Sequence, residues 1–64
     1  MRKTYQQKGC TVETDSENQT FTFYYGEMQG GRFTIADTEA YEKIIEMLEA
    51  GIDIASGKPV KGRR

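Results

Sequence analysis

The sequence predicts an α+β fold, in which a three-stranded antiparallel β-meander packs on one α-helix and a disordered basic tail follows. Two patterns predict this fold. Apolar and polar residues alternate with a period of two in three short segments within residues 10–36, and the period changes to that of an amphipathic helix from Thr38 onward. A chain of 64 residues has room for one domain. We therefore expect residues 1–55 to form a single domain and residues 56–64 to be a flexible tail.

The clearest strand covers residues 20–25, where aromatic side chains take every second position: Phe21, Phe23 and Tyr25. Residues 32–36 alternate in the same way, and Gly30-Gly31 before them provide the backbone freedom of a hairpin turn. A two-residue loop at these glycines would place the apolar residues of the two strands on opposite faces. We therefore predict a three-residue loop over residues 29–31, which pairs Tyr25 with Ile35 and Glu27 with Phe33.

An earlier strand is predicted over residues 10–14, and a loop over residues 16–19 would place Val12 opposite Phe23. These strands form an antiparallel meander with one apolar face. Whether residues 4–8 form a strand stays open, because this segment is polar and Gly9 would weaken or bulge a strand.

The helix is predicted from residue 38 to about residue 50, with an apolar stripe that comprises Tyr41, Ile44, Ile45 and Leu48. Asp37 or Thr38 is the expected N-cap, and Gly51 is the expected C′ residue. The helix should lie across the whole apolar strand face, which comprises Phe21, Phe23, Tyr25, Phe33 and Ile35.

Charge is unevenly distributed along the chain. All 10 carboxylates lie between Glu13 and Asp53, where only Arg32 and Lys43 oppose them, while the other Lys and Arg residues lie at the two ends. The formal net charge of −1 therefore hides an acidic body between basic termini.

Composition argues against catalysis, cofactors and metals. The chain has no histidine to activate its single cysteine, Cys10, which we interpret as a small buried hydrophobic residue. The carboxylates around residues 15–17 and 37–39 lack the spacing of a calcium loop. No apolar run is long enough to cross a membrane, and no signal peptide is recognised, so a cytoplasmic location is expected.

The favoured hypothesis is a non-catalytic protein-binding module. Four glutamates at helical spacing form an acidic stripe, and two further acidic residues are expected to extend it: Glu39, Glu42, Glu46 and Glu49, with Glu27 and Asp53. Such a surface would suit the basic groove of a nucleic-acid-handling protein, as in a small inhibitor or modulator from a phage or mobile element. A merely solvated helix face would also show this stripe, since Glu is a strong helix former and surface charge aids solubility. Whether the chain forms a homodimer stays open.

The alternative hypothesis is a small DNA-binding accessory protein. It would use the outer sheet face and the basic termini, with contacts from Tyr24, Arg32, Lys58, Lys61, Arg63 and Arg64. The order of three strands and one helix is similar to that of the arm-type DNA-binding domains of tyrosine recombinases. This architectural resemblance implies a sheet that lies in the major groove.

Overall fold

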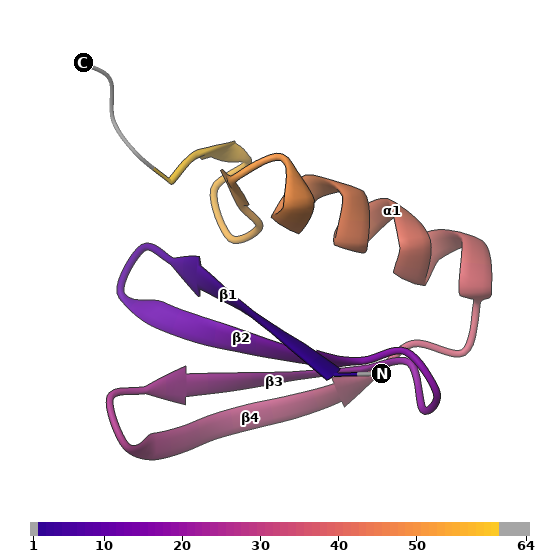
Figure 1. The fold of residues 1–64 in the computed structure, drawn as a ribbon, viewed down its shortest axis with the longest axis horizontal. Coiled ribbons are helices and arrows are strands. Elements are labelled where there is room, and N and C mark those ends of the chain that lie inside the picture. Colours follow the sequence, from indigo (N-terminus) through magenta and orange to yellow (C-terminus); the bar gives the residue numbers. More distant parts are fainter. Residues whose placement is uncertain (1, 61–64) are drawn as a thin grey trace.

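A four-stranded sheet, one helix and a short two-stranded ribbon make up the computed structural model, which describes residues 2–60 (Figure 1). The elements are β1 (Arg2–Gln7), β2 (Cys10–Asp15), β3 (Thr20–Tyr25), β4 (Met28–Thr34), α1 (Thr38–Glu49), β5 (Ile52–Asp53) and β6 (Lys58–Pro59). The sheet is an antiparallel meander in the order β1-β2-β3-β4, and β5 pairs with β6. The predicted α+β class is confirmed, but the sheet has four strands instead of three.

The additional strand is β1. The sequence analysis left open whether residues 4–8 form a strand, and the structure shows one over Arg2–Gln7. It turns into β2 at Lys8-Gly9, where Gly9 has a φ of 82° and Gln7 pairs with Cys10. Gln7 is buried, and its amide donates to the carbonyl of Ile52 at 3.1 Å and accepts from the N–H of Ile54 at 2.8 Å. Gln7 can thus occupy a core position because backbone groups of a distant segment satisfy the hydrogen-bonding capacity of its side-chain amide.

The β2–β3 hairpin follows the prediction. Val12 pairs with Phe23, and the loop between the strands covers residues 16–19. Asp15 stabilises this turn by accepting hydrogen bonds from the N–H of Glu17 at 3.1 Å and the side-chain amide of Asn18 at 2.9 Å.

The β3–β4 hairpin differs from the prediction. Its turn is Gly26-Glu27, in which Gly26 has a φ of 67°, so that Tyr25 pairs with Met28 and not with Ile35. Gly30 is the extra residue of a β-bulge, and beyond it Phe21 pairs with Phe33. The three-residue loop over residues 29–31 is therefore wrong. The bulge shifts the register by one residue and so keeps Phe33 on the same face as Phe21.

The helix begins and ends as predicted. Asp37 is the N-cap and accepts a hydrogen bond from the N–H of Glu39 at 3.0 Å. Gly51 takes the C′ position with a φ of 77°, and its N–H bonds the carbonyl of Leu48 at 3.1 Å.

The core lies between α1 and one half of the sheet. Its buried apolar residues are Val12, Phe21, Tyr41 and Leu48, and the rings of Phe21 and Tyr41 lie 4.6 Å apart. In Figure 1 the helix lies nearer to β1 and β2 than to β4. The expectation that α1 covers the whole apolar face is wrong, because Tyr25 is 52% exposed and Phe33 is 50% exposed.

The β5–β6 ribbon extends the ordered chain into the predicted tail. Ile52 pairs with Pro59, and Lys58 pairs with Asp53, so residues 58–59 form a strand. The last four residues of the predicted tail, 61–64, lie outside the described residues.

Candidate functional site

Three of the predicted acidic residues form a continuous flank of α1. Glu39, Glu42 and Glu46 are exposed, and their spacing of three and four residues places them on one side of the helix. Within residues 2–60, neither these glutamates nor Lys43, the single cation of α1, takes part in an ion pair. We call Glu39, Glu42 and Glu46 the acidic flank.

Glu49, the fourth glutamate of the stripe, is tied to the sheet. Its carboxylate accepts a hydrogen bond from the hydroxyl of Tyr5 at 2.6 Å and lies 3.5 Å from the ammonium of Lys3. The hydrogen bond from Tyr5, helped by Lys3, lowers the pKa of Glu49. Burial, together with the same hydrogen bond, raises the pKa of Tyr5 to about 12. This contact anchors the end of α1 to β1.

The other two predicted acidic residues lie apart from the flank. Asp53 is only 6% exposed. Its carboxylate accepts from the backbone N–H of Lys8 at 3.4 Å and from the hydroxyl of Ser56 at 3.0 Å, so it has a structural role in the ribbon. Glu27 is exposed in the β3–β4 turn.

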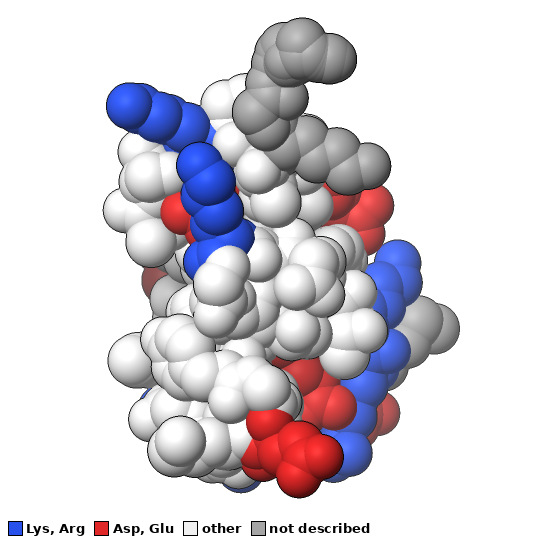
Figure 2. Space-filling model, turned by 90° about the vertical axis from the view of Figure 1, so that its left-hand side faces the viewer, with Lys and Arg blue, Asp and Glu red and all other residues white. Residues whose placement is uncertain are grey.

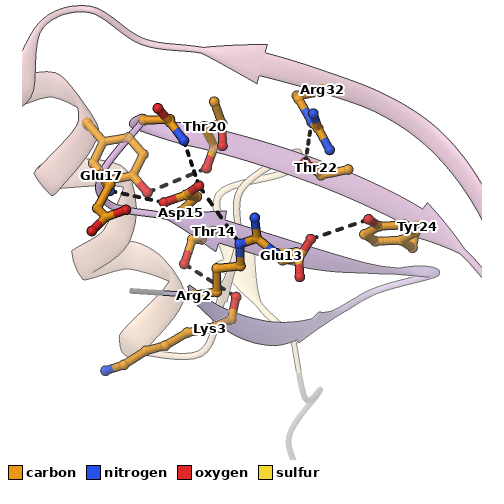
Figure 3. A network of polar contacts seen from close by, with 12 residues as sticks. Arg2, Lys3, Glu13, Thr14, Asp15, Glu17, Thr20, Thr22, Tyr24 and Arg32 are labelled. Atoms are coloured by element: carbon orange, nitrogen blue, oxygen red, sulfur yellow. Dashed lines mark hydrogen bonds and ion pairs between the residues drawn. The ribbon is translucent and has the colours of Figure 1, made fainter.

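The outer sheet face, the basis of the DNA-binding alternative, carries balanced charge (Figure 3). Arg32 donates to the hydroxyl of Thr22 at 3.0 Å, and the hydroxyl of Tyr24 donates to Glu13 at 3.3 Å. Nearby, Arg2 lies 3.9 Å from the carboxylate of Asp15. A hollow of about 500 Å³ on this face is therefore lined by two arginines and two carboxylates, which gives it little attraction for phosphates.

The termini add little to this alternative within the described residues. Lys58 is exposed in β6. The other predicted contacts, Lys61, Arg63 and Arg64, lie outside the described residues.

An uncharged surface that the sequence analysis did not predict lies between α1 and β4. A groove of about 340 Å³ is lined by Phe21, Phe23, Tyr25, Gly30, Gly31, Phe33, Ile35, Ile44 and Ile54. Met28, which pairs with Tyr25 across the hairpin, is 69% exposed. Figure 2 views the molecule from the left-hand side of Figure 1 and shows uncharged side chains across the middle of that face. We call this region the apolar groove. The sequence analysis missed this surface because it expected α1 to lie across the whole apolar strand face.

The single cysteine lies in an environment that disfavours a reactive thiolate. Cys10 is half-buried and packs against the core, and burial, with a smaller contribution from Asp53, raises the pKa of its thiol. The thiol form is thus favoured over the nucleophilic thiolate. Residues 2–60 contain no group of His, Cys, Asp or Glu side chains arranged to hold a metal ion.

The one helix of the described region is too short and too polar to span a membrane. Comparisons of the chain with protein-family models, curated proteins and solved structures gave no match.

Proposed function

We propose that this chain is a non-catalytic protein-binding module whose acidic flank docks on a basic surface of another protein. The observation that carries the proposal is that Glu39, Glu42 and Glu46 take part in no ion pair within residues 2–60, in contrast to Glu49, which has two partners on β1. A partner of suitable charge is a protein whose groove otherwise holds nucleic acid phosphates.

The physical argument is that like charges on this flank repel one another, and that Lys43 relieves this repulsion only in part. Like charges three and four residues apart destabilise a helix by about 0.2–0.5 kcal/mol per pair. Glu39 gains from the positive end of the helix dipole, whereas Glu42 and Glu46 lie beyond the first turn. Cations on a partner would relieve the repulsion between Glu42 and Glu46, and the concentrated negative field would speed their encounter. Direct DNA binding is less well supported, because the outer sheet face has balanced charge.

The test compares two charge-reversal variants of equal net charge. Glu42→Lys/Glu46→Lys alters the acidic flank, while the control Glu17→Lys/Glu27→Lys alters exposed turn residues. Glu39 is left unchanged because a lysine there would oppose the helix dipole. Lys and Glu have similar helix propensities, so circular dichroism should show an intact helix in both variants.

Each variant and the parent would be used to capture proteins from lysate with and without nuclease treatment, and the captured protein would then be purified for affinity measurements. The proposal predicts that the flank variant loses at least tenfold in affinity, that the control does not, and that association slows with added salt. Equal capture by both variants would contradict the proposal that the acidic flank binds the partner. Capture that disappears on nuclease treatment would instead favour nucleic-acid binding.

A further inference from the structure

The β5–β6 ribbon, residues 52–60, lies beside the turn between β1 and β2, just beyond the end of α1 (Figure 1). We infer that this ribbon opens as a unit while the sheet and α1 stay folded, and that it thereby controls access to the thiol of Cys10. This conformational device is independent of the proposed binding by the acidic flank.

The backbone hydrogen bonds of the ribbon stay within the ribbon and its junction with α1. β5 pairs with β6, the N–H of Gly57 bonds the carbonyl of Asp53 at 2.7 Å, and the N–H of Val60 bonds the carbonyl of Gly51 at 2.8 Å. Among the described residues, no backbone hydrogen bond joins the ribbon to the four-stranded sheet. The ribbon can therefore leave the sheet without breaking a backbone ladder, and it keeps its own hydrogen bonds when it does so.

Two side chains hold the ribbon on the sheet by hydrogen bonds. The buried amide of Gln7 donates to the carbonyl of Ile52 and accepts from the N–H of Ile54. The carboxylate of Asp53 accepts from the N–H of Lys8 at 3.4 Å, which is long for such a bond. No ion pair between described residues adds to this attachment. Because such hydrogen bonds replace bonds to water, their net contribution to holding the ribbon is modest.

Ile54 supplies the apolar part of the attachment. Its side chain is partly buried, packs against the core and lines the apolar groove. Residues 55–59, which follow it, are all exposed. By contrast, α1 contributes the buried side chains of Tyr41 and Leu48 to the core. A segment with little buried apolar surface and an exposed backbone belongs to the low-stability part of a fold, which opens before the core does.

Gly51 gives the ribbon a hinge at its junction with α1. The residue has a φ of 77°, and a Cβ atom added there would meet no atom within 4 Å. The backbone at this point is therefore uncrowded and has the conformational freedom of glycine. Rotation about this junction can carry the ribbon away from the sheet as one body.

Cys10 lies beside the point at which the ribbon is attached. It is the cross-strand partner of Gln7, and paired residues of antiparallel strands direct their side chains to the same face of the sheet. The charge of Asp53 adds to the effect of burial in raising the pKa of the Cys10 thiol, which agrees with a carboxylate close to this sulfur. Opening of the ribbon removes both the cover and the carboxylate. The thiol then meets solvent and forms the reactive thiolate more readily.

Thiol modification and amide hydrogen exchange of the full chain together test the inference. In the parent, an aromatic disulfide reagent should modify Cys10, the single cysteine, more slowly than in the unfolded chain. Exchange at the amides of Lys8 and Ile54 should be slowed by a similar factor, because one opening exposes all three groups. Exchange in the central strand β3 should be slowed at least tenfold more.

Two variants loosen the ribbon from opposite sides. Gln7→Leu removes two hydrogen bonds from the sheet side, and Ile54→Ala removes the apolar contact from the ribbon side. Each should speed both the modification of Cys10 and the exchange of the Lys8 amide at least tenfold, with a smaller change in β3. The control is Gln6→Leu, which alters an exposed residue of β1 and should change neither rate. An amide NMR spectrum checks the fold of each variant, and Ile54→Ala serves if Gln7→Leu does not fold.

Three results would overturn the inference. Equal slowing at Cys10 and in β3 would show that the thiol reacts only through unfolding of the whole domain. Modification of Cys10 in the parent as fast as in the unfolded chain would show that the ribbon does not shield it. Faster modification in the variants with unchanged exchange at Lys8 would show that the thiol is reached without opening of the ribbon.

Discussion

The ring of Tyr25 lies directly over Gly30, the bulged residue of β4. A Cβ atom added at Gly30 would lie 2.6 Å from Cδ2 of Tyr25, well inside van der Waals contact. At the neighbouring Gly31, an added Cβ would have only an ordinary contact of 3.6 Å with the ring of Phe33. The glycine at the bulge is therefore needed for the close approach of an aromatic ring.

This relationship predicts strong coupling between positions 25 and 30. Gly30→Ala should lower the free energy of unfolding by about 1–3 kcal/mol, because the ring of Tyr25 must move. The same substitution should cost much less in a Tyr25→Ala background, and Gly31→Ala should cost little in either. Urea unfolding of the four variants in each cycle measures the coupling. Equal costs of Gly30→Ala in both backgrounds would show that the ring does not constrain the bulge.

The buried amide of Gln7 predicts that stability is unusually sensitive to substitution at this position of the edge strand β1. Gln7→Leu leaves the carbonyl of Ile52 and the N–H of Ile54 without their side-chain partner, which should cost about 1–3 kcal/mol for each group that stays buried. The control is Gln6→Leu, since Gln6 is exposed on the same strand. Hydrogen exchange at the Ile54 amide should accelerate only in the Gln7 variant. Unchanged exchange there would refute the role of Gln7 in holding the ribbon.

The contact between Tyr5 and Glu49 predicts a dependence of stability on pH. Because the pKa of Glu49 is lower in the folded chain than its ordinary value, the ionised carboxylate stabilises the fold above the unfolded pKa. This stabilisation is lost as the pH falls through the folded pKa. Tyr5→Phe should raise the pKa of Glu49 in an NMR titration and reduce its share of the acid-induced loss of stability. Tyr24→Phe should leave the titration of Glu49 unchanged, and an identical effect of both substitutions would contradict the assigned contact.

The two halves of the sheet should differ in their tolerance of truncation. Phe21→Ala removes a buried ring stacked on Tyr41 and should cost about 3–5 kcal/mol. Phe33→Ala, although it lies opposite Phe21 on β4, should cost less than half as much, because half of Phe33 is already exposed to water. Thermal unfolding of the two variants makes this comparison. Equal losses would mean that α1 covers β4.

Local patterns predicted most of the fold. Short sequence patterns were enough to predict the strand over residues 20–25 and the helix caps at Asp37 and Gly51. The same patterns, with a short loop, predicted the pairing of Val12 with Phe23. The β3–β4 register could not be predicted in this way. Two glycine sites, Gly26 and Gly30-Gly31, could each hold the turn, and the choice depends on how Tyr25 packs.

The candidate site was predicted only in part, for a related reason. Helical spacing alone placed Glu39, Glu42 and Glu46 on one flank. Tyr5 of β1 bonds Glu49, while Asp53 bonds Lys8, which follows β1, and Ser56, which lies between β5 and β6. The structural roles of these two carboxylates therefore depend on tertiary contacts. The apolar groove depends on where α1 lies across the sheet, and no local sequence pattern predicts that position.

The central claim is that α1 packs on Val12 and Phe21 and leaves the β3–β4 hairpin uncovered around Met28. Nuclear Overhauser contacts in the NMR spectrum of the full chain test it most directly. We predict contacts from Tyr41 to Phe21 and from Leu48 to Val12, and none from α1 to Met28. Contacts between α1 and Met28, or no contact between Tyr41 and Phe21, would contradict the claim.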